Sequence, residues 1–266
     1  MAAVSRPDEA LSRDGRAARR GTFIFSPDPA HTEIAARAGF DLVIVDLEHA
    51  PLALADVVAH ARAARAGGIS CWARVGQLDP LAVGRLLDTG VDGVVLPHFG
   101  VDPAASRACL AAFQYPPRGT RPACSGVRSA GYGLSDFAAE AERGSMAEAV
   151  ALIEDAAVLD RLDEVLAWPG LHAVIPGGPG DLAASLGLPG QGDHATVRAA
   201  VERIVTAAKA QPGLKAGLYV TGLPSLASWR GGPLDFVVLS IDYRVLAHAY
   251  RAAAEALTAS GFEDPG

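Results

Sequence analysis

Residues able to carry acid–base, carboxylate-binding or metal chemistry recur in this chain directly after short apolar runs. The clearest case is Asp46-Leu47-Glu48-His49, which ends the apolar run that starts at Leu42. Polar side chains are also expected at later strand ends, at Arg74, His98, Glu154 and Asp181. Because buried parallel strands of an α/β fold end at one rim, we predict that these side chains converge on a single site. For the first motif, a polar cluster that only caps the following helix is the alternative interpretation.

Two of these residues, Glu154 and Asp181, are predicted to bind a divalent cation. They follow successive strands, which lie about 4.8 Å apart in a sheet, so both carboxylates can reach one ion. Two oxygen ligands with room for water suit Mg²⁺ or Mn²⁺ better than a structural Zn²⁺ site. The structural alternatives are an ion pair between Glu154 and Arg161, and a role for Asp181 as the N-cap of a helix beginning at Leu182.

Arg74 is predicted to bind the organic substrate, and His49 is predicted to act on it as a general base. Arg74 ends a strand, where its guanidinium can bind a substrate carboxylate through two hydrogen bonds; an ion pair between strands is the alternative. His49 is a plausible general base because imidazole titrates near neutral pH. The histidines at helix or strand-entry positions are expected to be incidental, namely His31, His60, His172, His194 and His248.

The placement of lysine narrows the chemistry further. The chain has only Lys209, in a predicted helix, and Lys215, at the start of a predicted strand and therefore at the opposite rim. Neither amine is placed for Schiff-base chemistry. An enolate stabilised by a metal ion is therefore the favoured reaction type.

The elements that must position these residues alternate along the chain. The predicted strands are Thr22–Phe25, Leu42–Leu47, Ser70–Val75, Gly93–Pro97, Ala149–Ile153, Ala173–Pro176, Ala216–Val220 and Phe236–Ile241. The predicted helices are Leu52–Ala66, Pro80–Thr89, Ala104–Phe113, Ala157–Trp168, Ala195–Ala210 and Val245–Leu257. This alternation favours an α/β fold of the (β/α)8 TIM-barrel type over an open doubly wound sheet. A nucleotide-binding fold is disfavoured because a Gly-x-Gly-x-x-Gly turn and a Walker loop are both missing.

The longest connection, Tyr115 to about Glu148, begins with Tyr115-Pro116-Pro117-Arg118-Gly119-Thr120-Arg121. Long insertions in a barrel usually serve the active site or a contact between subunits. Alternatively, the two prolines simply end the preceding helix.

Length, composition and net charge limit the number of domains, the partners and the location of the protein. The 266 residues, half of them hydrophobic, fit one large domain, which we place at 21–258 between an N-terminal extension, 1–20, and a tail, 259–266. The net charge of −7 argues against nucleic-acid or anionic-membrane partners. No apolar run reaches the roughly 20 residues of a membrane-spanning helix, and no signal-peptide core is seen, so a cytoplasmic location is expected. Cys71, Cys109 and Cys124 predict no disulfide framework.

Several motifs together carry a resemblance to a known family. They are Asp46-Leu47-Glu48-His49-Ala50-Pro51, Arg74 followed by Asp79-Pro80, Tyr115–Arg121, Ile153-Glu154 and Gly178-Pro179-Gly180-Asp181-Leu182-Ala183-Ala184-Ser185-Leu186-Gly187. In this order, from about Gly21 to Ala254, the chain resembles the HpcH/HpaI family of metal-dependent pyruvate aldolases. The resemblance implies a (β/α)8 barrel that cleaves 4-hydroxy-2-oxoacids reversibly to pyruvate and an aldehyde, assembled as a homo-oligomer, a trimer or hexamer, with an exchanged C-terminal helix.

The resemblance also implies roles for individual residues. Glu154 and Asp181 would bind Mg²⁺, Mn²⁺ or Co²⁺, and Arg74 would hold the carboxylate and enolate of pyruvate. His49 would move the proton, through water and with Asp46 or Asp88 nearby. The backbone around Gly180 and the hydroxyl of Ser125 would line the carboxylate pocket.

The chain departs from the family pattern beside the predicted metal site. Leu152 stands where relatives commonly carry a substrate-contacting Gln, and His98 and the segment Pro122–Arg128 also differ. We therefore expect Leu152 and His98 to border the substrate. Two alternatives stay open: an oxaloacetate-decarboxylating, enolate-transferring enzyme that resembles macrophomate synthase, and a non-catalytic ligand-binding barrel.

Overall fold

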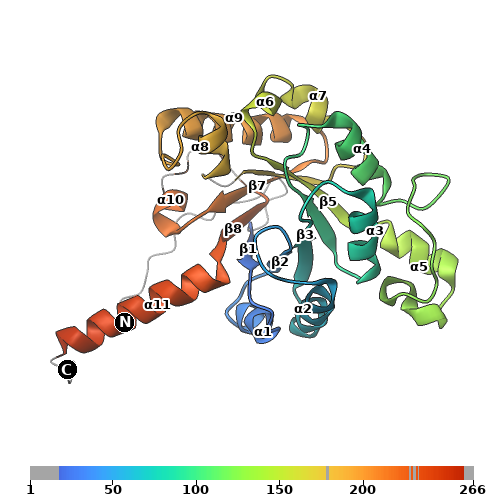
Figure 1. The fold of residues 1–266 in the computed structure, drawn as a ribbon, viewed down its shortest axis with the longest axis horizontal. Helices are drawn as coiled ribbons and strands as arrows, with labels where there is room; N and C mark the ends of the chain where they lie inside the picture. Colours follow the sequence, from blue (N-terminus) through green and yellow to red (C-terminus); the bar gives the residue numbers. More distant parts are fainter. Residues whose placement is uncertain (1–17, 178–179, 228, 230–231, 233, 261–266) are drawn as a thin grey trace.

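The computed structural model describes residues 18–177, 180–227, 229, 232 and 234–260, which fold around a closed barrel of parallel strands (Figure 1). The strands follow chain order around the barrel: β1 (Arg19–Ile24), β2 (Leu42–Asp46), β3 (Ser70–Arg74), β4 (Gly93–Leu96), β5 (Glu148–Ile153), β6 (Ala173–Pro176), β7 (Lys215–Val220) and β8 (Phe236–Ile241). The barrel closes where β1 pairs with β8, with Arg19 opposite Phe236. The predicted (β/α)8 TIM barrel is confirmed.

Helices surround this barrel. Their bounds are α1 (Ala30–Arg37), α2 (Leu54–Gly67), α3 (Pro80–Asp88), α4 (Pro103–Ala111), α5 (Phe137–Gly144), α6 (Ala156–Leu159), α7 (Leu162–Leu166), α8 (Asp181–Ser185), α9 (Ala195–Ala210), α10 (Leu223–Ala227) and α11 (Asp242–Ala259), with a 3₁₀ segment η1 (Arg128–Gly133). Side chains cap several helix starts: Asp79 and Asp102 accept hydrogen bonds from the first turns of α3 and α4, and His194 accepts one from the first turn of α9.

Two apolar clusters follow from the alternation of side chains along each strand. Side chains that point outward, such as Val43 and Val45, pack beneath the helices. Those that point inward, such as Leu42 and Ile44, fill the barrel, where Trp72 meets Phe236 edge to face with ring centres 5.3 Å apart. Residues that continue this alternation past the end of a strand therefore direct their side chains into the space above the barrel core.

The elements differ from the sequence-based prediction in several places, and α1 and α10 lie where no helix was predicted. β1 begins at Arg19, so Arg19 and Arg20, which we had assigned to the N-terminal extension, pair with Phe236 and Val237 of β8. The predicted helix Ala157–Trp168 is divided into α6 and α7. The long connection between α4 and β5 contains η1 and α5, which lie beside the barrel at the far right of Figure 1. Residues 1–17 of the extension and 261–266 of the tail lie outside the described residues.

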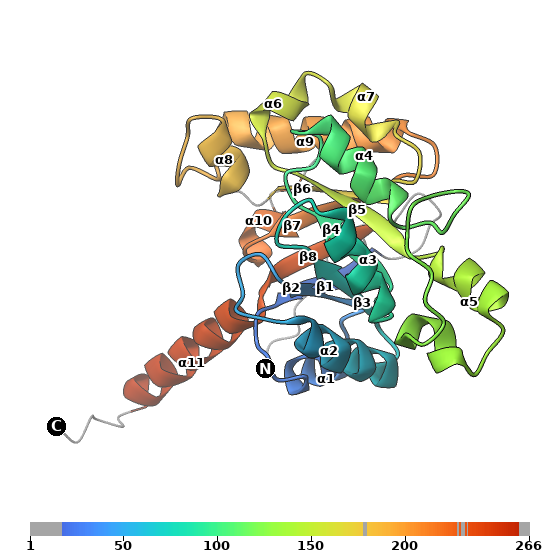
Figure 2. The ribbon, with the colours of Figure 1, turned by 45° about the vertical axis from the view of Figure 1, so that its right-hand side comes forward.

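The last helix does not cover the barrel. Figures 1 and 2 show α11 projecting away from the other elements, and none of its residues, Asp242–Ala259, is buried. Across the described chain, no helix combines the length and apolar character needed to cross a membrane.

Candidate active site

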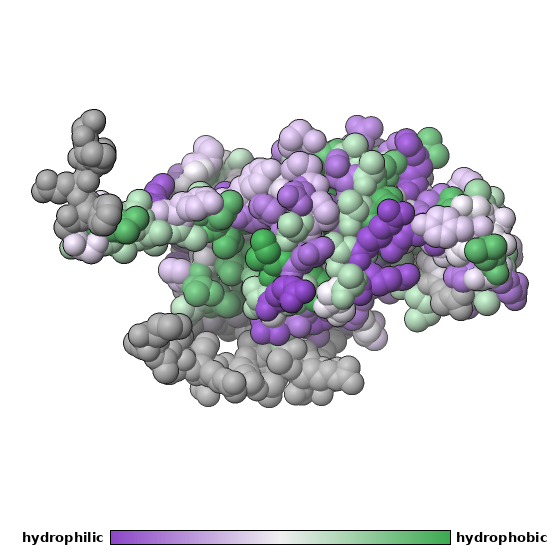
Figure 3. Space-filling model, turned by 90° about the horizontal axis from the view of Figure 1, so that it is seen from below, coloured by the Kyte–Doolittle hydropathy of each residue, from purple (hydrophilic) through white to green (hydrophobic). Residues whose placement is uncertain are grey.

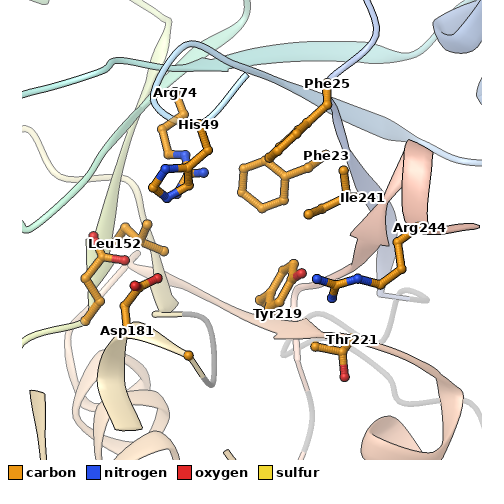
Figure 4. A pocket seen from close by; sticks show the side chains of 12 residues that line it. Phe23, Phe25, His49, Arg74, Leu152, Asp181, Tyr219, Thr221, Ile241 and Arg244 are labelled. Atoms are coloured by element: carbon orange, nitrogen blue, oxygen red, sulfur yellow. The ribbon is translucent and has the colours of Figure 1, made fainter. Parts of the chain in front are cut away.

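A pocket of about 210 Å³ opens above the barrel core at the carboxyl ends of the strands (Figure 4). Its charged and polar lining includes many of the residues singled out from the sequence. The lining residues are Phe23, Phe25, His49, Arg74, Leu152, Glu154, Gly180, Asp181, Tyr219, Thr221, Ile241 and Arg244. Strand alternation explains much of this convergence, because Arg74 and Glu154 continue the inward rows that hold Trp72 and Leu152.

Arg74 is held at one side of the pocket by two carboxylates. β2 and β3 pair in register with Asp46 opposite Arg74, and one Arg74 terminal nitrogen donates to Asp46 Oδ2. The other terminal nitrogen lies 2.8 Å from Glu48 Oε2. The guanidinium carbon also lies 5.0 Å from the ring centre of Phe23. Arg74 thus forms the predicted alternative, an ion pair between strands, while its side chain still lines the pocket.

Asp46 orders the segment that carries Glu48 and His49. Its side chain is fully buried, and Oδ1 accepts hydrogen bonds from Glu48 N at 2.7 Å and His49 N at 3.0 Å. Since the same carboxylate also pairs with Arg74, it fixes the position of the arginine and of the loop together. His49 lines the pocket with an imidazole that is 54% exposed, 3.8 Å from Glu48 Oε2.

Glu154 directly follows β5, which is two strands along the barrel from β3, and its buried side chain lies against Gly177. The register of β5 and β6 continues beyond Ile153 and Pro176, so Glu154 faces Gly177, where an added Cβ would overlap the Glu154 Cα and Cβ atoms. Burial raises the pKa of Glu154 to about 7, and the hydrogen bond from His98 N at 2.8 Å offsets only part of that shift. The predicted ion pair between Glu154 and Arg161 is not formed; Arg161 instead pairs with Glu164.

Asp181 is the first residue of α8, and its N-cap is Gly180. The alternative in which Asp181 caps a helix starting at Leu182 is therefore not observed. Figure 4 shows the Asp181 carboxylate directed into the pocket, on the side of Leu152 and His49. Glu154 and Asp181 line the same pocket, as the sequence predicts. Among the described residues, no group of three or more His, Cys, Asp and Glu side chains is arranged to hold a metal ion.

His98 lies beside the pocket lining rather than in it. Its backbone has a positive φ of 48°, a conformation uncommon for residues other than glycine, and this directs its N–H to Glu154. Its Nδ1 lies 3.0 Å from Asp155 Oδ2, and its Nε2 lies 3.7 Å from Glu48 Oε1. Burial lowers the pKa of His98, but the hydrogen bond with Asp155 and the charge of Glu154 outweigh that effect and raise it.

The structure places Asp88 and Ser125 away from this pocket. Asp88 ends α3, which runs back from the top of β3 toward the start of β4, and its Oδ1 lies 2.7 Å from Arg121. Ser125 is an exposed residue of the long connection between α4 and η1. A single chain therefore does not bring these two residues to Arg74.

Sequence reasoning missed one side of the pocket. Its apolar wall is formed by Phe23, Phe25 and Ile241, with Tyr219, Thr221 and Arg244 beyond them. Tyr219 lies in β7 at a position whose side chain points into the barrel, so strand alternation in the sequence could have predicted it. Burial raises the pKa of Tyr219, and a hydrogen bond with Arg244 opposes that rise. Arg244 belongs to a helix, and strand patterns give no signal for it.

A pocket lined by polar and charged side chains at the carboxyl ends of barrel strands marks the active-site face of a TIM-barrel enzyme. The chain belongs to the HpcH/HpaI aldolase/citrate lyase family, whose model matches residues 19–249. It is 33% identical over 239 residues to a hydroxypyruvate/pyruvate aldolase of Paraburkholderia phytofirmans, covering 88% of this chain and 90% of the relative. A pyruvate aldolase of Rhizobium etli is 32% identical, covering 86% of this chain and 88% of the relative.

A solved structure agrees with this assignment. The crystal structure of an HpcH/HpaI aldolase/citrate lyase family protein from Burkholderia cenocepacia matches with a TM-score of 0.83 and 28% identity, covering 92% of this chain and 96% of that one. The family resemblance read from the motifs is therefore confirmed.

Proposed function

We propose that this protein is a divalent-metal-dependent pyruvate aldolase, a carbon–carbon lyase that forms and cleaves 4-hydroxy-2-oxoacids. The observation that carries the proposal is the meeting of two carboxylates, Glu154 and Asp181, with Arg74 in one pocket. A 2-oxoacid presents a carboxylate and a neighbouring carbonyl oxygen, which match a guanidinium and a cation-binding carboxylate pair. The relatives named as pyruvate aldolases support the same substrate class.

The donor set suits a hard divalent cation. Glu154 is a buried carboxylate whose pKa is raised by burial and by the nearby charge of Glu48, so a cation beside it would relieve the cost of its ionised form. Glu154 and Asp181 would hold the ion, leaving room for substrate oxygens and water, as Mg²⁺, Mn²⁺ or Co²⁺ accept. When bound, the ion supplies electrostatic stabilisation of the negative charge that develops on the substrate oxygen.

The other residues bind substrate and move the proton. Arg74 donates two hydrogen bonds to the oxoacid carboxylate, and Asp46 and Glu48 fix its position. In the cleavage direction, His49 accepts the proton of the C4 hydroxyl, directly or through water, as the C3–C4 bond breaks. The bond's electron pair stays on the pyruvate fragment as an enolate, and a proton added at C3 completes pyruvate. Gly180, Leu152 and His98 border this reaction centre.

A role for Asp88 or Ser125 at this site requires a second copy of the chain to supply them, because their own chain holds them elsewhere. Assembly is supported by α11, an amphipathic helix whose apolar side chains are exposed. We infer a homo-oligomer, a trimer or hexamer, in which α11 packs on a neighbouring copy.

Exchange of the C3 protons of pyruvate with D₂O tests the proposal without an acceptor. We expect exchange by the wild-type protein with Mg²⁺ or Mn²⁺, and its loss after EDTA treatment. The variants Glu154→Gln and Asp181→Asn should abolish exchange while leaving the circular dichroism spectrum and melting temperature close to wild type. A folded, metal-loaded wild-type protein that gives no exchange would contradict the proposal and favour a ligand-binding barrel.

Leu152 favours a second candidate, an oxaloacetate decarboxylase that transfers the enolate. It lines the pocket beside Glu154 with an apolar side chain that cannot orient a substrate by hydrogen bonding. If Leu152 sets the choice of reaction, Leu152→Gln should raise the ratio of aldol cleavage to oxaloacetate decarboxylation. The measurement is product analysis with both substrates; an unchanged ratio would assign Leu152 a packing role only.

A further inference from the structure

The last strand of the barrel contains a strained residue beside the pocket. Ser240 has a backbone φ of 54°, in the left-handed region that residues other than glycine, asparagine and aspartate rarely adopt. Its side chain is buried, and its Oγ has no hydrogen-bond partner among the residues that the structure describes. Both features cost stability, and backbone strain persists only where the surrounding structure holds it. Contacts on either side of Ser240 must therefore maintain this conformation.

The strain coincides with a β-bulge in β8. Gly21 of β1 lies opposite Val238, whereas Phe23 lies opposite Ile241, so β8 advances three residues while β1 advances two. One extra residue is thus inserted into β8 at this point. Ser240, the residue with the positive φ, lies within the inserted stretch. The left-handed backbone at Ser240 is therefore what allows the extra residue.

The bulge changes which side chain faces the pocket. Phe236 and Val238 point into the barrel, so strict alternation would direct Ser240 inward and Ile241 outward. Ile241 instead packs on the inner cluster and lines the pocket. Figure 4 shows Ile241 across the pocket from Leu152. An apolar side chain therefore stands on this wall in place of a hydroxyl group.

The bulge also sets the start of α11. Asp242 directly follows Ile241, and it accepts hydrogen bonds from Phe25 N at 3.0 Å and Ser26 N at 3.2 Å. Its Oδ2 lies 2.8 Å from His31 Nδ1. Because Phe25 also lines the pocket, these bonds hold a second apolar side chain of the wall. The residues just after the bulge thus fix both the wall and the first turn of the helix.

We propose that Ser240 is a positioning residue for this pocket wall. Its left-handed backbone admits one extra residue into β8, which turns Ile241 inward and brings Asp242 to the loop after β1. The property needed at this position is tolerance of a positive φ, and the hydroxyl group is not required. The shape of the wall does not depend on which reaction the pocket performs, and only the kinetic test of this inference rests on the proposed aldolase function.

Melting temperatures of matched variants test the backbone at this position. Ser240→Gly should melt about 2–4 °C above Ser240→Ala, and Ser240→Thr below both, because a β-branched side chain disfavours a positive φ most. Ser70 of β3, a serine without a positive φ, is the matched control. There the order should reverse, with Ser70→Thr the most stable and Ser70→Gly the least. The same order at both positions would overturn the inference.

The direction of the Ile241 side chain can be measured by NMR of its δ1 methyl group, assigned with Ile241→Val. The wild-type protein and Ser240→Gly should show a nuclear Overhauser contact between this methyl group and the ring of Phe23, which lies opposite Ile241. Ser240→Thr keeps the hydroxyl group but should lose most of this contact. A contact of wild-type intensity in folded Ser240→Thr, or its absence in Ser240→Gly, would contradict the positioning role.

Kinetics separate the wall from the reacting centre. Proton exchange of pyruvate uses the side of the pocket with Arg74, Glu154 and Asp181, whereas aldol addition also needs an acceptor held in the rest of the pocket. Ser240→Thr should raise KM for the acceptor butanal by about 10-fold, the effect of losing roughly two methylene contacts, and should slow proton exchange much less. Ser240→Gly, which keeps the bulge, should keep the wild-type KM. Equal losses in both reactions would assign Ser240 a general structural role and refute the inference. A wild-type protein without exchange would refute the aldolase and leave the melting and NMR tests of Ser240 decisive.

Discussion

At the scale of single residues, the site depends on groups that are held before any substrate binds. Arg74 contacts Asp46, Glu48 and the ring of Phe23, so its guanidinium does not need to be ordered when a carboxylate arrives. Such preorganisation is the main source of electrostatic stabilisation in enzymes. Because these contacts depend on the planar shape of the guanidinium, a lysine that keeps the positive charge would not reproduce them.

The variant Arg74→Lys should therefore lose about 2–4 kcal/mol of transition-state stabilisation, because an ammonium group cannot pair with two carboxylates and bind a third through two hydrogen bonds. The measurement is kcat/KM for aldol cleavage, with Arg37→Lys on α1 as the control for a surface change. A near-normal kcat/KM in Arg74→Lys would show that Arg74 has only a structural role, in the ion pair between β2 and β3.

Gly177 predicts a second effect at this scale. A methyl group at this position would overlap Glu154, so Gly177→Ala must displace β5 from β6 or turn the Glu154 carboxylate away. We expect a loss of roughly 1–3 kcal/mol in the free energy of unfolding, the usual cost of overpacking, together with weaker Mn²⁺ binding. Urea unfolding and calorimetry measure the two effects. Gly84→Ala, where the nearest atom lies 4.0 Å away, is the matched control and should show neither.

At the scale of elements, a buried histidine joins the first two helices to the end of β1. His60 of α2 lies 2.8 Å from Thr32 Oγ1 of α1 through Nδ1, and 2.9 Å from the Ser26 carbonyl oxygen through Nε2. The carbonyl can only accept, so Nε2 carries the proton and Nδ1 accepts from the threonine hydroxyl. Burial lowers the pKa of His60, and the hydrogen bond to Ser26 opposes only part of that shift.

This network predicts a pH dependence of stability. An unfolded histidine titrates near 6.5, whereas folded His60 titrates lower, so the unfolded chain binds more protons between the two values. The free energy of unfolding should therefore fall as pH drops below about 6.5, by at most about 1.4 kcal/mol per pH unit from this group. Above that pH the contribution is constant.

Urea unfolding at several pH values from 7.5 to 5 measures this effect. His60→Asn should be less stable than wild type at pH 7.5 but should lose less stability on acidification. His248→Asn changes an exposed histidine of α11 and should keep the wild-type slope. Equal slopes for wild type and His60→Asn would show that His60 does not couple folding to pH.

At the scale of the whole molecule, α11 is the element that the single chain leaves without a packing partner. Its apolar side chains recur on one face, at Tyr243, Leu246, Tyr250 and Leu257, with exposed fractions of 47%, 41%, 69% and 57%. Figure 3 shows apolar side chains along this projecting helix and on the adjoining barrel. Most helical stability in proteins comes from packing of the apolar face, so a partner surface is expected.

The double variant Leu246→Asp/Tyr250→Asp should therefore convert the protein to monomers. Light scattering coupled to size-exclusion chromatography measures the mass directly. Glu255→Gln, on the opposite face of the helix, should retain the wild-type assembly. A wild-type protein that is already monomeric would contradict the proposed trimer or hexamer.

The sequence by itself determined a parallel α/β fold, because short apolar strand runs alternate with helical segments, and it favoured a closed barrel over an open sheet. It also placed Arg74, Glu154 and Asp181 at strand ends, where the family motifs gave them roles. Side-chain alternation is local, so residues such as Asp46 and Glu154 could be assigned to the inward rows without coordinates.

Only the tertiary structure decided which groups meet across the pocket. The pairing of Arg74 with Glu48, the contact between Gly177 and Glu154, and the approach of Arg244 to Tyr219 each join distant segments. Such contacts depend on barrel register and on the path of a helix that leaves the barrel, and neither is encoded by a local pattern. For the same reason the family resemblance could suggest roles for Asp88 and Ser125 but could not reveal that their own chain holds them away from the site.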